Sequence, residues 1–197
     1  MKRHLIILAA LLFALPATAQ NNVAIKTNLL YGATSFTPNL SIEVGLGKQT
    51  TIDLAVGYNW FNVDYCNTSN TNNKKLAHWI VQPEVRYYLC ERFNGHFFGA
   101  HSTYSEYNIG GYNLPMFFGK GSQDFRHQGH AIGMGVSYGY QLLLSRRWNI
   151  EFNVGLGYMQ FEYDKFDRVA CGKLIEKDAI TNYFGLTKAG VTISFML

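Results

Sequence analysis

Seven charged residues recur on one side of segments in which apolar and small residues alternate. Three are basic and four are acidic: Lys26, Glu43, Asp53, Glu84, Arg86, Glu151 and Lys188. Alternate residues of a strand point to the same face, so Glu84 and Arg86 would project together. Charges of both signs stabilise each other on an enclosed face, whereas a buried charge without a partner is costly. The pattern favours a structural network of ion pairs over a catalytic pair or an ion pathway.

The histidines are the other candidates for catalysis or metal binding, but their spacing in the sequence suits neither. Those beyond the N-terminal segment are His78, His96, His101, His127 and His130. His127 and His130 would lie on opposite faces of a strand. His101 and Ser105 would share a face but lie about 13 Å apart, too far for a His–Ser relay. Because phosphate-loop, dinucleotide, zincin and nucleophile-elbow motifs are also missing, we predict no catalytic residues, no metal site and no cofactor.

The composition points to β-structure whose outer surface is not simply water-facing. Charged residues make up 15% of the 197 residues, aromatic residues another 15%, and there are 19 glycines. The charged fraction of soluble domains is about 25%. The net charge of +4 includes Lys2 and Arg3, and the rest of the chain is only weakly basic. We therefore expect no nucleic-acid partner.

The N-terminus has the pattern of a secretory signal peptide over residues 1–19. Lys2 and Arg3 form a basic region, Leu5 to Leu15 an apolar region, and Ala17 to Ala19 a small-residue cleavage site. The apolar run is too short for a spanning helix, which needs about 20 residues. The pattern predicts export through a cleaved signal peptide, followed by one β-barrel domain over residues 20–197.

Eight segments alternate with the period of two that is typical of strands. They are residues 23–36, 40–47, 51–60, 78–90, 96–107, 127–142, 149–161 and 183–197. Long connections, 61–77, 108–126 and 162–182, alternate with short turns, although the first connection, 37–39, is also short. Outer-membrane barrels alternate long external loops with short periplasmic turns in this way. The pattern predicts an all-β, eight-stranded antiparallel up-and-down transmembrane barrel, with Pro83 marking a bulge.

The two faces of these segments differ in a way that suits a membrane. Opposite the apolar side chains lie many small residues, which fit the crowded interior of an eight-stranded barrel. In the fifth segment, Phe97 and Phe98 support opposite registers, and we assign Phe98 to the apolar outward face. Aromatic residues form two belts, one near the long loops (Tyr31, Tyr58, Trp60, Trp79, Tyr104, Tyr158) and one near the short turns (Tyr87, Phe98, Tyr138, Tyr140, Phe152, Phe195). Such belts flank the apolar band of membrane barrels. A soluble, lipocalin-like periplasmic barrel that binds an apolar ligand stays open as an alternative.

The three cysteines have no zinc-site spacing and allow at most one disulfide. In the predicted topology, Cys66 and Cys171 lie in long loops on one side, and Cys90 lies at the opposite rim. The apolar band of a membrane barrel is about 25 Å tall, whereas a disulfide needs Cα atoms within about 7 Å. Cys66–Cys171 is therefore the pairing that the topology allows, and three free thiols are the alternative.

Several stretches along the chain are similar to those of a known family. They are KTNLLY at 26–31, TPNL at 37–40, HW at 78–79, QPEVRY at 82–87, CERFNGHF at 90–97, VSYGY at 136–140, NYFG at 182–185 and TKAG at 187–190. In these stretches the sequence resembles the domain-of-unknown-function 3575 family, small outer-membrane β-barrel proteins of Bacteroidetes. The resemblance implies an outer-membrane barrel, in some genomes encoded near fimbrial genes. It implies no activity and supplies no catalytic residues.

The sequence favours a non-enzymatic barrel in the bacterial outer membrane that presents external loops. Its expected role lies in envelope structure, adhesion or surface (fimbrial) assembly. The expected partners are outer-membrane lipid and surface or fimbrial proteins. A lipid-modifying barrel enzyme is the second hypothesis, and the soluble periplasmic barrel is the third.

Overall fold

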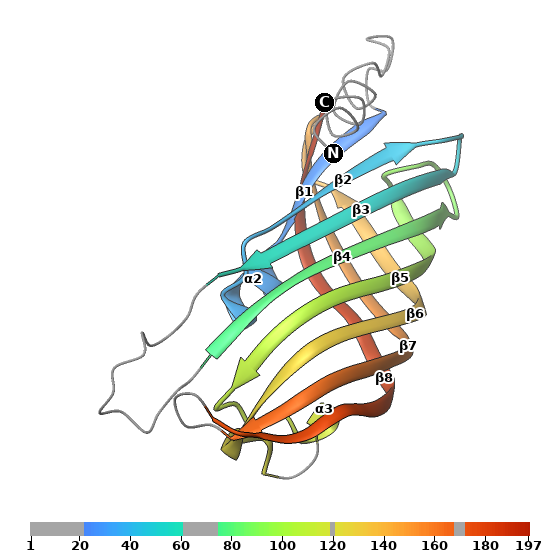
Figure 1. Ribbon diagram of the computed structural model, residues 1–197. Helices are drawn as coiled ribbons and strands as arrows, with labels where there is room; N and C mark the ends of the chain where they lie inside the picture. Colours follow the sequence, from blue (N-terminus) through green and yellow to red (C-terminus); the bar gives the residue numbers. More distant parts are fainter. Residues whose placement is uncertain (1–21, 61–74, 119–120, 168–171) are drawn as a thin grey trace, which may run out of the picture.

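A closed barrel of eight antiparallel strands forms the molecule, and each strand pairs with its neighbours in sequence (Figure 1). The computed structural model describes residues 22–60, 75–118, 121–167 and 172–197. The strands are β1 (Val23–Asn28), β2 (Asn39–Gly45), β3 (Thr50–Asn59), β4 (Lys75–Tyr88), β5 (Gly95–Gly110), β6 (Phe125–Leu143), β7 (Trp148–Asp167) and β8 (Leu174–Met196). This confirms the predicted all-β antiparallel meander. The predicted signal peptide, 1–19, lies outside the described residues.

Short helical elements occur at one end of the barrel, which we call the loop end. They are α2 (Leu29–Ser35), α3 (Pro115–Phe118) and the 3₁₀ turn η1 (Ser122–Asp124). The opposite end, the turn end, carries the short connections 46–49, 89–94 and 144–147. Among the described residues, no helix has the length and apolar character needed to cross a bilayer.

The prediction of one strand over 23–36 was wrong, because the strand stops at Asn28 and α2 follows. The Asn28 side chain accepts a hydrogen bond from the Tyr31 N–H (3.1 Å) and so caps the helix. Asn39 closes the other end of the connection: its Oδ1 accepts from the Asn28 N–H at 2.7 Å, and its Nδ2 donates to the Asn28 carbonyl at 2.9 Å. The first connection at the loop end is therefore 29–38, longer than the predicted three-residue turn.

All three predicted long loops were partly wrong, because strands continue into them: β4 begins at Lys75, β5 ends at Gly110 and β6 begins at Phe125. β7 extends to Asp167 and β8 begins at Leu174, so most of 162–182 is a hairpin. Cross-strand contacts of polar residues hold this region: Arg126 lies over the Phe166 ring at 4.4 Å, and Lys165 over the Phe125 ring at 3.9 Å. The outward side chains turn polar here, which hid the strands from a search for apolar alternation.

The expected bulge at Pro83 was also wrong. β4 and β5 keep one register on either side of it, from Val81↔Tyr104 to Glu84↔His101. Instead, the pairing of β7 with β8 shifts between Gly155↔Lys188 and Leu156↔Leu186, which leaves Thr187 as an extra residue. Sequence alternation gives no signal for this bulge.

The outward face of the barrel is apolar around its middle, and the inward face is polar. Phe98 is 53% exposed on the outside, whereas Phe97 is fully buried inside, which confirms the register chosen for this strand. Most of the predicted belt residues project outward, but Tyr31 does not. It lies on α2, and its hydroxyl is 2.7 Å from His78 Nε2.

Candidate functional site

Arg86 stands at the centre of the barrel interior and contacts four carboxylates at once. Its Nε is 2.6 Å from Glu84 Oε2, and its Nη2 is 3.2 Å from Asp53 Oδ2. Its Nη1 is 3.0 Å from Glu43 Oε2 and 2.9 Å from Glu151 Oε2. The planar guanidinium, with five donors in a fixed geometry, suits a site with so many acceptors.

Two lysines complete the network. Lys26 Nζ pairs with Glu43 and lies 2.6 Å from Glu151 Oε2. Lys188 Nζ lies 2.7 Å from Glu84 Oε2. The structure thus brings all seven predicted interior charges into one connected set, which we call the charge network. It joins residues of β1, β2, β3, β4, β7 and β8 across the lumen.

Neutral side chains satisfy the remaining oxygens of the charge network. The Tyr88 hydroxyl lies 2.8 Å from Glu43 Oε1 and 2.7 Å from Gln141 Oε1. Ser41 donates to Asp53 Oδ1 at 2.8 Å, and Asn153 donates to Glu151 Oε1 at 2.6 Å. Ser137 donates to Glu84. Sequence reasoning missed these partners, although each lies on the same strand face as the charges, and that shared face was the available signal.

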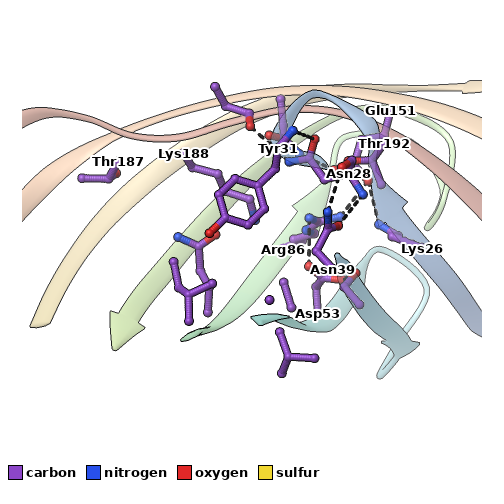
Figure 2. A pocket seen from close by; sticks show the side chains of 18 residues that line it. Lys26, Asn28, Tyr31, Asn39, Asp53, Arg86, Glu151, Thr187, Lys188 and Thr192 are labelled. Carbon is purple, nitrogen blue, oxygen red and sulfur yellow. Dashed lines mark hydrogen bonds and ion pairs between the residues drawn. The ribbon is translucent and has the colours of Figure 1, made fainter. Parts of the chain in front are cut away.

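A cavity of about 130 Å³ separates the charge network from α2. Tyr31 lines it from the helix, and Lys26, Asp53, Arg86, Glu151 and Lys188 line it from the barrel wall (Figure 2). A water molecule occupies about 30 Å³ of liquid, so the cavity has room for a few waters or one small polar molecule. It is too small for a lipid chain or a drug-sized ligand, which needs about 300 Å³ or more.

The interior histidine does not form the relay considered from the sequence. His101 Nε2 lies 2.9 Å from Thr187 Oγ1 at the β8 bulge, and Ser105 Oγ donates to the Trp79 carbonyl. Glycines make room for the ring, because a Cβ at Gly135 or Gly155 would lie 2.9 Å from it. His101 therefore packs and bonds to the bulge, and Ser105 bonds elsewhere.

The other histidines are spread over the molecule. His78 contacts α2, His96 lies outside against Tyr138, and His130 faces Glu162 at 3.7 Å. Among the described residues, no three metal-ligating side chains come together. Cys90 is an exposed free thiol in the β4–β5 turn. The predicted Cys66–Cys171 pair lies outside the described residues.

Beyond the apolar middle, the interior of the loop end is a packed aromatic cluster. Its buried members are Tyr107, Ala131, Phe161, Tyr163 and Tyr183, with Phe117 and Phe118 of α3 against them. His127 stacks on Phe118 with ring centroids 4.3 Å apart. Burial, and to a smaller degree the charge of Lys165, lowers the pKa of His127 to about 4. The imidazole is therefore neutral in this cluster at physiological pH.

Comparison with known sequences relates the chain to one family. No curated protein matches the sequence significantly. The sequence model of one family, described as protein of unknown function (DUF3575), matches residues 5–197, nearly the whole chain. The chain therefore belongs to the DUF3575 family.

Proposed function

We propose that the protein is a non-enzymatic β-barrel of the bacterial outer membrane that presents its loop end outside the cell, for envelope structure, adhesion or surface (fimbrial) assembly. The observation that carries the proposal is the inverted polarity of the barrel's middle. Val136 is 67% exposed on its outward face, while the seven charges of the network are buried inside. A soluble ligand-binding barrel has the opposite arrangement, with an apolar interior and a polar outer face.

The outward apolar band has about the height expected for a membrane barrel. On β6 it runs from Ile132 to Leu142 through Met134, Val136 and Tyr138. Ten residues of strand span about 33 Å, which corresponds to about 23 Å of height at a tilt of about 45°. The apolar band of membrane barrels is about 25 Å tall and is flanked by aromatic girdles. Tyr58 and Trp60 lie outward at the loop end, and Tyr87 and Trp148 lie outward toward the turn end, which fits such girdles.

The charge network supports a structural role for the interior. Each carboxylate contacts at least one cation, and the guanidinium of Arg86 contacts all four carboxylates. Such a network ties opposite walls together and fills the lumen. The lipid-modifying enzyme is the weaker hypothesis, because His101 bonds to Thr187 and its Nδ1 has no hydrogen-bond partner among the described residues that would orient it as a base.

The loop end supports presentation of a surface. β5 to β8 extend beyond the apolar band, and the aromatic cluster gives this extension a core of its own. A surface that rests on a packed core keeps its shape for a partner, which lowers the entropy cost of binding. This is the property required of an adhesin or of an anchor for surface structures.

Topology and membrane residence can be tested in one set of cells. A membrane-impermeant thiol reagent, applied to intact reduced cells, should label Cys66 and Cys171 but not Cys90, which lies at the turn end. The protein should stay in the membrane after a carbonate wash and migrate differently in SDS before and after boiling. Release by carbonate with unchanged migration would refute the membrane barrel. Labelling of Cys90 alone would mean that the barrel has the opposite orientation in the membrane.

The non-enzymatic part of the proposal has a separate test. Mass spectrometry of outer-membrane lipids from cells with and without the protein should give the same lipid species. A lipid whose acylation or head group changes with the protein would favour the enzyme instead. A pull-down of the intact protein from detergent-solubilised outer membrane should recover surface-structure proteins, and recovery should fall when residues of the loop end are replaced.

A further inference from the structure

The three short turns surround a hollow of about 710 Å³, which we call the turn-end hollow. Its lining comes from the β2–β3, β4–β5 and β6–β7 turns and from the adjoining ends of β6, β7 and β8. The lining residues used below are Lys48, Arg92, Phe93, Leu143, Arg146, Asn149 and Met196. Phe93 and Met196 are buried against Ala24 inside the barrel. The hollow therefore opens at the end of the barrel rather than on its outward face.

The rim of the turn-end hollow is basic. Lys48, Arg92 and Arg146 line it, and Glu91 is the one acidic lining residue in the described part of the chain. No carboxylate among the described residues lies within ion-pair distance of these three cations. Arg92 is held in place: its Nη1 donates to the Gly47 carbonyl at 3.1 Å, and its stem crosses Gly45, where a Cβ would lie 2.9 Å from Arg92 Cδ.

The floor of the turn-end hollow offers a hydrogen-bond acceptor without a donor. Asn149 is fully buried, and its Nδ2 donates to the Phe93 carbonyl at a long 3.5 Å. Its Oδ1 has no partner among the described residues. A buried acceptor without a donor is unfavourable unless another molecule supplies one. Apolar surface lies beside it at Leu143, which is 51% exposed, while the buried side chains of Phe93 and Met196 close the floor.

We propose that the turn-end hollow binds an acidic peptide segment. Its carboxylates would meet Lys48, Arg92 and Arg146, and an apolar side chain would pack on Leu143 beside Phe93 and Met196. One amide N–H would donate to Asn149 Oδ1, which is shielded in the free protein, so binding would part the floor slightly. A peptide is the ligand class that supplies an anion, an N–H donor and an apolar group within a short distance. An inorganic anion lacks the apolar part. An anionic lipid head group would approach the outward face of the turns, whereas the hollow opens along the barrel axis.

Cys90 provides a direct reporter, because it is exposed and lines the same hollow. The protein is purified in detergent as the Cys66→Ser/Cys171→Ser variant, so that Cys90 is the only thiol. The rate of Cys90 modification by a thiol reagent is then measured against a capped peptide of alternating glutamate and leucine. Parallel samples contain the glutamine–leucine peptide, inorganic phosphate or phosphatidylglycerol micelles. We expect saturable protection by the glutamate peptide alone, weakening as salt rises.

Single substitutions in the turn-end hollow, compared with a control at the loop end, show where the peptide binds. Lys48→Gln and Arg146→Gln should each weaken the peptide Kd about two- to fivefold, as expected for exposed charge pairs. Asn149→Leu should weaken it about two- to tenfold without changing the salt dependence, since a neutral hydrogen bond is lost. Lys173→Gln, which removes an exposed charge at the loop end, is the control and should change nothing.

Each outcome of the protection assay either supports the peptide site or contradicts it. No protection by the glutamate peptide, or equal protection by the glutamine peptide, would overturn the proposal. Protection by phosphatidylglycerol but not by the peptide would overturn it in favour of a lipid site. The two surface variants decide the matter even if Asn149→Leu fails to fold. Because the assay runs in detergent, its result does not depend on the role proposed for the loop end.

Discussion

The middle of the barrel and its loop end are built from the same strands with opposite polarity. On β7, Glu151 points inward and Phe152 outward, whereas ten residues later Phe161 points inward and Glu162 outward. Charges fill the lumen in the middle, and aromatic rings fill it at the loop end. The hydrophobic effect drives apolar groups away from water, so the inversion is the pattern expected if the proposed membrane surrounds the middle and water surrounds the loop end. The proposed membrane boundary lies between these positions, near Tyr158.

The two regions should also differ in what stabilises them. In the middle, ion pairs and hydrogen bonds across the lumen must hold the walls together, because the apolar side chains face outward. At the loop end, the rings around Phe118 and Phe161 pack as in the hydrophobic core of a water-soluble protein. The comparison leads to four predictions.

The largest effect is expected from Arg86→Ala. The substitution leaves four carboxylates in the interior with two lysines to neutralise them. Breaking a buried pair typically costs about 3–5 kcal/mol. The temperature at which the barrel loses its compact SDS migration should therefore fall markedly. Arg126→Ala, which removes an arginine from the face of Phe166 at the loop end, should cost about 1 kcal/mol or less. Equal shifts for the two variants would contradict the central role of the charge network.

Phe161→Ala should destabilise the loop end without opening the middle. Removing a buried aromatic ring costs about 3–5 kcal/mol, largely through the cavity left behind. We expect faster hydrogen exchange and proteolysis in β7 and β8 around 159–183, with an unchanged SDS migration temperature. A matching loss of the compact SDS form would mean that the two regions unfold as one unit.

Val136→Arg tests whether the outward face of the middle meets lipid. An arginine at the midplane of a membrane barrel costs about 2–4 kcal/mol, and the cost falls to about 0–1 kcal/mol near the interface. His130→Arg, on the same strand and face but beyond the apolar band, should therefore be nearly neutral. The measurement is the free energy of unfolding in lipid vesicles. If Val136→Arg is as mild as His130→Arg, the apolar band is not in a bilayer.

The smallest effect is expected from lowering the pH, which protonates the His127 imidazole. Its pKa is about 4 in the fold against the ordinary value of 6.5, so the folded state favours the neutral imidazole. The unfolded chain binds the proton more readily. The contribution of neutral His127 to the stability of the loop end is therefore fully present above about pH 6.5 and is lost as the pH falls toward 4. Hydrogen exchange of 159–183 should rise over this range. His127→Phe, which keeps a ring beside Phe118, should remove this component of the pH dependence.

Much of the architecture follows from local pattern. Alternation identified eight strands, their meander order and the face that carries the seven interior charges, because the side-chain period of a strand is a property of the backbone. Alternation places Phe97 and Phe98 on opposite faces but does not say which points outward, and the choice of Phe98 was correct. The turn between β4 and β5 was also visible, since Glu91 to Gly95 interrupts the alternation.

Other features depended on contacts that are distant in sequence. Residues 29–35 alternate well enough for a strand, but the Asn28 cap, its bonds to Asn39 and the Tyr31–His78 contact make them a helix. The ends of β7 and β8 were hidden because their outward residues become polar where the surroundings change. Only the closed barrel decided that Arg86 meets four carboxylates, that Thr187 bulges toward His101, and that three turns enclose Asn149. Alternation gives the face on which a side chain lies, whereas strand stagger and barrel closure decide which side chains face one another across the lumen.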